Sequence, residues 1–440
     1  MNNLDFDFSK DEFLRNPIAR GIIKLITSTS KFSPLIIDGD WGTGKTIFCK
    51  RIIDIMNNEF EEEYKNRILY IDAFQTESYG DALSTILSEI ITLYPKKKSD
   101  IIKSAVPVIL KAGLITAGKA AGRYLLRQDF DTMASDYEDI IEKSEDQLLE
   151  KAVSRLLNKN QECKQGIDLL KKTLIDLTKN KSIFIFIDEL DRCRPDFALD
   201  FLEKIKHIFN VGNVNFILIS NLKHLSYSVG NCYGQLFDGY SYLEKFYKYK
   251  VSLPKEFSED SSRRKVLASI KYFNILVAES EQLNGSCLVQ DSFEKTIANR
   301  IIFVSNLSLR KVEAFIRNLE VFDILAPANI KITSQAPSLS KALSIMAIYV
   351  LSTYKTDEAT QLLTSNTYEI TNIFGSQGEV IINGQKDNRF DIIKSLVNSQ
   401  WDKSLRQRIN NGWSGYLDFT EDYKNSREFF NKIIQLMQFL

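Results

Sequence analysis

Histidine and cysteine are scarce in this sequence of 440 residues. There are two histidines, His207 and His224, so a histidine-based zinc site is not expected. The five cysteines are scattered, at positions 49, 163, 193, 232 and 287. No pair of them has metal-ligand spacing, and their odd number argues against a disulfide framework. We therefore expect a reducing compartment, the cytoplasm.

The sequence also lacks a long apolar run and an excess of charge. No window offers 18 uncharged apolar residues, and the best candidate, 342–354, predicts a buried helix instead of a membrane span. The amino terminus, MNNLDFDFSKDEF, is acidic and polar, unlike a signal peptide. Lys and Arg together number 57, as do Asp and Glu, so net charge points neither to nucleic acid nor to membranes. We expect a soluble protein that does not span a membrane.

Proline and glycine are few, at 8 and 19, and 44% of the residues are hydrophobic, which allows a sizeable core. Short runs rich in β-branched and aromatic residues alternate with helical patterns such as 13–28 and 195–209. The runs are nearly continuous in apolar residues, which is typical of strands buried on both faces. Their alternation with helices predicts a parallel α/β sheet. The five runs are 33–38, 67–74, 182–190, 213–221 and 248–254.

After Pro254 helical patterns dominate. We expect a core domain over 1–255, a helical lid over 256–335 and a mostly helical C-terminal region over 336–440. Asn383-Gly384 is a turn signal that favours a small hairpin at 379–385. The segments that look helical are 261–280, 291–304, 308–323, 338–354 and 427–440.

A helical insertion at 84–180 separates the second and third predicted strands. Within it, residues 96–127 carry eight Lys and Arg against one acid, and residues 128–150 carry nine acids against one base. Three interpretations remain open: docking to an anionic membrane, binding of nucleic acid phosphates, or a soluble hairpin in which the two halves attract each other. We favour the hairpin, because Gly113, Ala117 and Ala121 would allow close packing but offer little apolar area to a membrane.

One stretch, LIIDGDWGTGKTIF, predicts a phosphate-binding loop between a strand and a helix. Its glycines let backbone N–H groups converge on phosphate oxygens, and the next helix points its positive end at the anion. Lys45 would reach the β- and γ-phosphates and act in catalysis, and Thr46 would hold Mg²⁺. The alternative is a structural turn. The residues expected to contact nucleotide here are Gly39, Asp40, Trp41, Gly42, Thr43, Gly44, Lys45, Thr46 and Ile47.

A second site is expected where the strand at 182–190 ends in Asp188 and Glu189. Ligands bind at the carboxyl ends of parallel strands, so Asp188 could hold Mg²⁺ and Glu189 could polarise an attacking water. The alternative is an acidic strand end that faces solvent or caps the helix predicted at 195–209. Arg192 and Arg194 follow at once and could act on the nucleotide of a neighbouring subunit, or pair with Asp191 or Glu189.

Two further residues are candidates for nucleotide contact. Asn221 ends the strand at 213–221, where it could touch the γ-phosphate or serve only as a turn residue. Arg310 lies in the first turn of the helix predicted after residue 306, where a cation opposes the helix dipole. That placement suggests a phosphate contact, although an ordinary surface arginine fits nearly as well.

Taken together, several segments resemble the KAP family of P-loop NTPases over roughly residues 10–325. The most specific are the tryptophan within GDWGTGKT and the acidic string DELDRCRP. The resemblance implies an ATPase core of the additional-strand, catalytic-glutamate type with a helical lid. It implies Lys45 and Thr46 as ligands of ATP and Mg²⁺, Asp188 as the Walker B acid, Glu189 as the catalytic acid and Arg310 as a lid arginine. Many relatives carry membrane helices in the insertion, but here Lys111, Lys119 and Arg123 interrupt it.

These observations favour an ATP-hydrolysing molecular switch that forms a homo-oligomer or acts with a separately encoded effector. Bacterial relatives suggest a role in defence against phages or mobile elements. The alternative is a nucleotide-binding scaffold with little turnover that docks through its basic insertion. A nucleic-acid motor is not favoured, because the charge is balanced and no nucleic-acid-binding motif is recognisable.

Overall fold

The computed structural model describes most of residues 13–77 and 181–364, residues 425–438, and scattered positions within 167–179 and 373–397. The chain divides into two compact units. The first unit runs from Arg15 to Leu253, and the second comprises Pro254 onward together with Phe13 and its two neighbours. The charged halves of the insertion, residues 96–150, lie outside the described residues.

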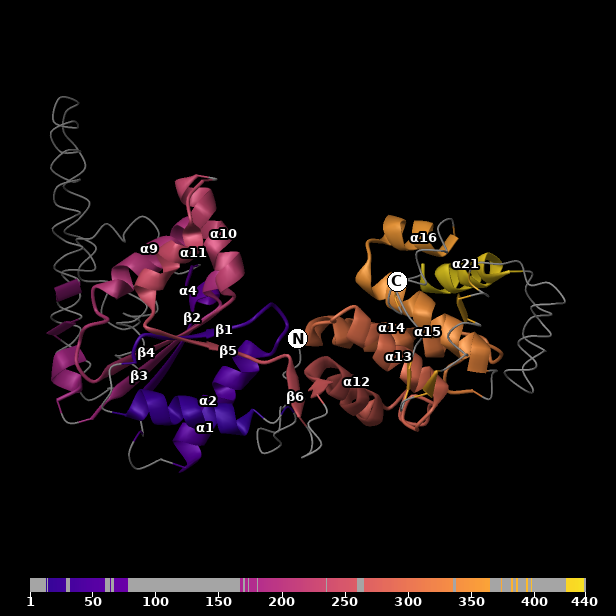
Figure 1. The fold of residues 1–440 in the computed structure, drawn as a ribbon, viewed down its shortest axis with the longest axis horizontal. Coiled ribbons are helices and arrows are strands. Elements are labelled where there is room, and N and C mark those ends of the chain that lie inside the picture. Colours follow the sequence, from indigo (N-terminus) through magenta and orange to yellow (C-terminus); the bar gives the residue numbers. More distant parts are fainter. Residues whose placement is uncertain are drawn as a thin grey trace, which may run out of the picture. The chain divides into compact units, whose positions relative to one another are not determined.

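The first unit is built on a five-stranded parallel sheet with the strand order β2-β3-β4-β1-β5 (Figure 1). Each strand lies within one of the five apolar runs, so the predicted parallel sheet is confirmed. β4 lies between β1 and β3, as the additional-strand type requires. The strands are β1 (Leu35–Asp38), β2 (Ile68–Asp72), β3 (Ile183–Asp188), β4 (Val214–Ser220) and β5 (Tyr249–Ser252).

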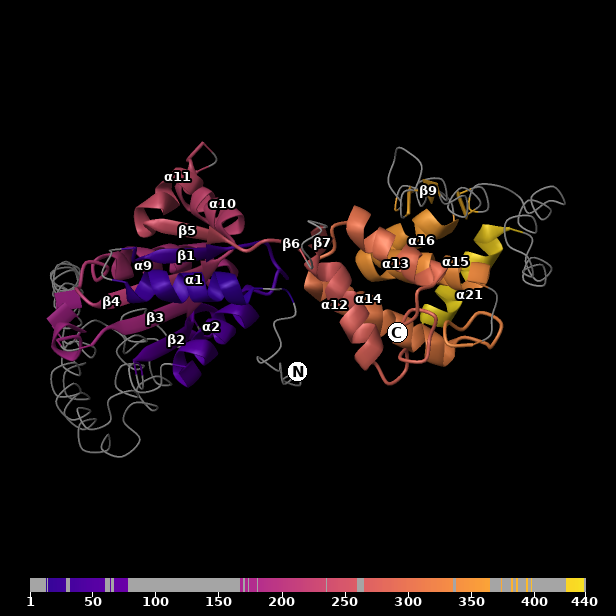
Figure 2. The same ribbon diagram turned by 60° about the horizontal axis from the view of Figure 1, so that its bottom comes forward.

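Helices cover both faces of this sheet (Figure 2). Phe184 and Phe186 of β3 pack in one cluster with α1 and α2, and Ile185 and Ile187 pack on the opposite face with α9 and α10. Alternate side chains of a strand point to opposite faces, so a strand covered on both must be apolar throughout. The described helices are α1 (Asn16–Thr27), α2 (Lys45–Glu59), α4 (Ala73–Glu77), α9 (Pro195–Lys206), α10 (Leu222–Tyr233) and α11 (Gly239–Leu243), with 3-10 turns at Leu190–Arg192 (η3) and Glu244–Phe246 (η4).

Strand β5 departs from the expected burial. Tyr249, Lys250 and Ser252 are exposed, although the run 248–254 was expected to be buried on both faces. The reason is position, because β5 is an edge strand that pairs with β1 alone in its sheet. Lysine on an exposed edge strand also discourages pairing with other chains.

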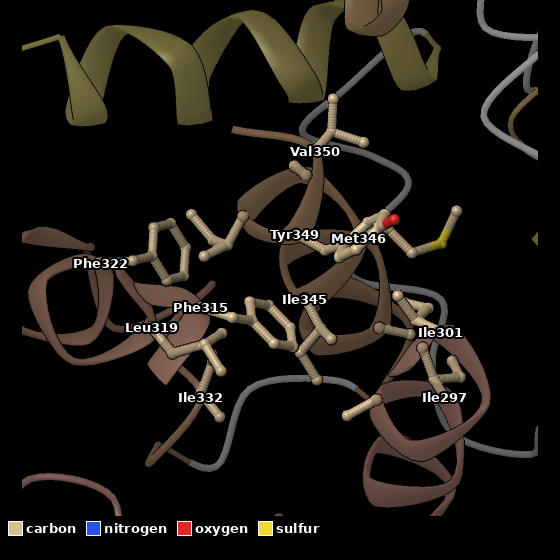
Figure 3. Packing of buried hydrophobic residues seen from close by; sticks show 14 of the residues in the cluster. Ile297, Ile301, Phe315, Leu319, Phe322, Ile332, Ile345, Met346, Tyr349 and Val350 are labelled. Atoms are coloured by element: carbon tan, nitrogen blue, oxygen red, sulfur yellow. The ribbon is translucent and has the colours of Figure 1, made fainter. Parts of the chain in front are cut away.

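The second unit packs helices around α15, whose residues from Leu339 to Val350 are all buried. In Figure 3 the α15 side chains Ile345 and Met346 lie among side chains of α13 and α14. A helix surrounded in this way is apolar on every side, which confirms the buried helix predicted for 342–354. The described helices are α12 (Ala268–Glu279), α13 (Phe293–Val304), α14 (Leu309–Leu325), α15 (Ser338–Thr353), α16 (Thr356–Thr364) and α21 (Ser426–Met437).

Several of these helices begin at a capping side chain. The Ser292 hydroxyl accepts from Lys295 N at 3.0 Å, and the Asn425 amide oxygen accepts from Glu428 N at 3.0 Å. Such caps satisfy N–H groups that have no partner within the first helical turn. Helices on both sides of residue 335 share one hydrophobic core, and the domain limits expected at 255 and 335 stay a proposal.

Two short hairpins complete the second unit. β8 (Ile381–Ile382) pairs with β9 (Gln385–Lys386), which confirms the hairpin predicted from Asn383-Gly384. β6 (Glu256–Ser258) pairs with β7 (Lys265–Leu267), and this second hairpin corrects the helix expected over 261–280. The helix α12 begins only at Ala268, because the preceding residues pair with β6. Among the described residues, no helix is both long and apolar enough to cross a membrane.

Candidate functional site

A glycine-rich turn joins the end of β1 to the start of α2, and residues 39–46 are called the phosphate loop from here on. Gly42 and Gly44 have φ values of 73° and 81°, which side chains with a Cβ rarely adopt. A Cβ at Gly39 would lie 2.9 Å from Thr43 Oγ1. The Thr43 hydroxyl in turn donates to the Asp40 carbonyl at 2.8 Å. The glycines are therefore required by the shape of the loop.

Lys45 is the first residue of α2, and its side chain folds back over the loop. Its ammonium group donates to the carbonyls of Gly39 at 2.8 Å and Asp40 at 3.2 Å. The side chain is buried, and the helix starts directly beneath it. A cation and the positive end of a helix dipole therefore meet at one point, which favours an anion there.

Asp188 is the last residue of β3 and is 1% exposed. Its carboxylate accepts from Tyr70 Oη at 3.1 Å and from the N–H of Glu189 at 2.8 Å. Burial nevertheless raises the pKa of the Asp188 carboxyl, because desolvation outweighs these bonds and the nearby Thr46 hydroxyl. A buried carboxylate of this kind gains from a cation held beside it.

Glu189 has a left-handed backbone with a φ of 63°, a costly conformation for a residue with a side chain. Its carboxylate accepts from the Thr46 hydroxyl at 3.3 Å and pairs with Arg192 Nε at 2.5 Å. Burial and the charge of Asp188 raise the pKa of Glu189, whereas Arg192 lowers it. A strained, partly desolvated carboxylate at a strand end is typical of a catalytic base.

The structure brings Lys45, Thr46, Asp188 and Glu189 to one edge of the sheet. β1 and β3 both pair with β4 in parallel, so their carboxyl ends lie on the same side. The Thr46 hydroxyl and the Asp188 carboxylate supply the hard oxygen ligands that Mg²⁺ prefers. The residues present therefore fit a magnesium ion and a phosphate group.

Asn221 and Arg310, the two other candidates for nucleotide contact, belong to different units of the chain. The Asn221 side chain accepts from His224 N at 3.1 Å and caps α10, directly after β4. It therefore has a structural role, and its contact with nucleotide stays a prediction. Arg310 lies in the first turn of α14, in the second unit, and its role in binding phosphate also stays a prediction.

Some contacts of the phosphate loop could not be read from the sequence. Trp41 Nε1 donates to Asp191 Oδ2 at 2.5 Å, and the Trp41 ring lies 4.2 Å from the ring of His224. Asp191 is 3% exposed and also accepts from Ser220 Oγ at 3.2 Å. The tryptophan inside the loop was a visible signal, but its partner lies 150 residues away.

The two arginines after the acidic strand end are both paired. Arg192 pairs with Glu189, as described above, and Arg194 Nε pairs with Glu77 Oε1 at 2.6 Å. The sequence left open whether these arginines pair within the chain or act on a neighbour. The pair between Arg192 and Glu189 is one of these alternatives, whereas Glu77 is a partner that no local sequence pattern indicates.

Known proteins resemble this chain to different degrees. It is similar over its whole length to the Aeropyrum pernix ORC2 protein in its ADPNP–ADP complexes, with 13% identity, 99% of each chain covered and a TM-score of 0.34. No curated protein matches the chain. The profile of the KAP family P-loop domain matches residues 15–326, well over half of the sequence. The phosphate loop and the acidic strand end both lie within the matched residues, and the chain belongs to the KAP family of P-loop NTPases.

Proposed function

We propose that this protein binds and hydrolyses ATP and works as a molecular switch. Membership of a P-loop NTPase family supports nucleotide binding and hydrolysis. One observation carries the proposal for this chain: the hydroxyl of Thr46 in the phosphate loop donates at 3.3 Å to the carboxylate of Glu189, directly after the acidic strand β3. A loop that binds phosphate and a base that could activate water are thus in one place.

Each residue has a distinct part in the proposed reaction. The Lys45 ammonium group and the N–H groups of the loop bind and orient the phosphates. Thr46 and Asp188 would hold Mg²⁺, which neutralises charge that develops on the phosphate oxygens. Glu189 accepts a proton from the attacking water and orients it. The proposed products are ADP and inorganic phosphate.

The test of this function is Lys45→Ala, with the exposed Lys50→Ala on the same helix as the matched control. Lys45→Ala is expected to lose ATP binding or turnover while the protein stays folded by circular dichroism. Lys50→Ala should behave as the wild type. A folded Lys45→Ala protein with unchanged ATP affinity and turnover would refute the site. A parallel titration with GTP decides whether the site prefers the adenine or the guanine nucleotide.

The switch is proposed to act by changing its assembly or its contact with a separately encoded effector, in defence against phages or mobile elements. This part rests on family resemblance and on the arginines near the acidic strand end. Light scattering of a Glu189→Gln protein with and without ATP tests it. A monomer under both conditions at micromolar concentration would leave no role for an arginine from a neighbouring subunit.

The alternative is a scaffold with little turnover that docks through the basic insertion. An intrinsic ATPase rate near zero, together with flotation on anionic liposomes, would favour it. Changing Lys96, Lys97, Lys98 and Lys103 to glutamine should then abolish flotation. A duplex-DNA shift assay at physiological salt separates nucleic acid from membrane.

A further inference from the structure

Arg15 directly precedes α1 and is 5% exposed, unusually low for an arginine. Its guanidinium Nη1 donates to the carbonyl oxygen of Thr43 at 2.9 Å, across 28 residues of sequence. Thr43 lies between Gly42 and Gly44, the two residues of the phosphate loop with positive φ. A buried cation therefore contacts the phosphate loop between two glycines, where the backbone has the most conformational freedom.

The geometry of the peptide bond gives this contact a consequence for ligand binding. In a planar trans peptide, the carbonyl oxygen and the following N–H point to opposite sides. The Thr43 carbonyl and the Gly44 N–H belong to one such plane. Because Gly44 has no Cβ, its backbone alone does little to fix that plane. By holding the carbonyl on one side, Arg15 directs the Gly44 N–H to the other, where the loop would receive phosphate.

The position of Arg15 is itself fixed by the start of α1. The Arg15 carbonyl accepts from Ala19 N at 2.9 Å, within the first helical turn. The next residue, Asn16, accepts through Oδ1 from Arg51 Nε at 2.5 Å, and Arg51 belongs to the helix that follows the phosphate loop. The two helices are thus tied together, which limits how far the backbone at Arg15 can move.

We propose that Arg15 is a positioning residue of the phosphate loop, which holds the Thr43–Gly44 peptide with its N–H toward bound phosphate. The inference rests on the proposed function, because it assigns Arg15 to the nucleotide site. Neither the phosphate-loop motif nor the acidic strand end includes this residue.

Titration of the full chain with a fluorescent ADP analogue tests the proposal. Arg15→Gln should weaken binding roughly tenfold to a hundredfold, the usual value of a hydrogen bond from a charged donor. Arg15→Lys should recover part of the affinity, because an ammonium group can still donate. Arg20→Gln, within α1, is the matched control. The pair of Arg20 with Glu59 is exposed, so this substitution should leave the affinity within about twofold of the wild type.

Two outcomes separate this inference from the proposed function. If Lys45→Ala loses binding and a folded Arg15→Gln protein binds as the wild type does, Arg15 has no positioning role. If Lys45→Ala also binds normally, the nucleotide site itself is refuted. If the role of Arg15 were purely structural, Arg15→Gln would lower the free energy of unfolding and leave the dissociation constant for the nucleotide unchanged.

Arg15→Lys provides a second variant in case Arg15→Gln does not fold. It should weaken binding in the same direction but less, and it should speed hydrogen exchange in peptides covering residues 39–46. Unchanged affinity and unchanged exchange in a folded Arg15→Lys protein would overturn the positioning role.

Discussion

The indole N–H of Trp41 donates to the buried carboxylate of Asp191 at 2.5 Å. This bond joins the phosphate loop to the turn that follows the acidic strand, so the two halves of the proposed site are connected directly. Asp191 also accepts from Ser220 at the end of β4, the strand between them. One carboxylate therefore bridges the ends of all three central strands.

We predict that Trp41→Phe, which keeps a ring beside His224 and removes the donor, will lower the free energy of unfolding by about 1–3 kcal/mol. Asp191→Ala, which removes the acceptor, should cost at least as much. Because both variants remove one interaction, a double-mutant cycle by urea unfolding should give a coupling energy of more than about 1 kcal/mol. Additive effects of the two substitutions would show that the bond contributes little.

Glu189→Gln is predicted to bind ATP with Mg²⁺ but to hydrolyse it about 10²–10⁴-fold more slowly, because the attacking water loses its proton acceptor. Single-turnover phosphate release measures the chemical step, and the fluorescent ADP analogue measures binding. Glu203→Gln on α9 is a suitable control, since its carboxylate accepts from the hydroxyls of Tyr233 and Tyr242. Turnover near the wild-type rate would move the role to another acid, with Asp191 the first candidate.

Arg192→Gln is predicted to shift the acidic limb of the turnover profile to higher pH. Glu189 must be ionised to accept a proton, so turnover falls as the pH drops through its pKa. Arg192 lowers that pKa through the ion pair with Glu189, and removing the cation raises it. Turnover measured between about pH 5.5 and 9 checks the shift, with Lys204→Gln as the control.

The height of the plateau at high pH gives a second result. If Arg192 only restrains Glu189 within its own chain, Arg192→Gln frees the carboxylate, and the turnover rate at the plateau equals or exceeds that of the wild type. If Arg192 acts on the nucleotide of a neighbouring subunit, the plateau falls as well. An unshifted acidic limb would contradict the link between the ion pair and the basicity of Glu189.

The strands were predictable because burial on both faces forces a continuous apolar run, as in β3 and β4. β7 was missed because it has only three residues, beginning with Lys265, and exists through its pairing with β6. The phosphate loop and the acidic strand end were predictable because each is a local motif. The contacts of Arg15 and Trp41 were not, because they depend on folding across 28 and 150 residues.

The electrostatics of Asp188 give the last prediction, that Asp188→Asn stabilises the protein in the absence of nucleotide. Burial raises the pKa of Asp188 in the folded state, so folding favours its protonated form. Stability therefore falls as the pH rises from the ordinary Asp pKa through the raised folded pKa, and the loss persists above that interval. Asparagine removes the charge but can still pair with Tyr70 Oη and Glu189 N.

Urea unfolding at pH 7.5 should show a gain of about 1 kcal/mol for Asp188→Asn, of the size seen when a strained functional group is removed. The gain should shrink as the pH is lowered, because the wild-type carboxyl then takes up its proton. Asp200→Asn is the control, since that acid is exposed in a pair with Lys204. The same Asp188→Asn protein should lose the Mg²⁺ dependence of nucleotide affinity. A variant less stable than the wild type at pH 7.5 would show that the hydrogen bonds of the carboxylate outweigh its desolvation.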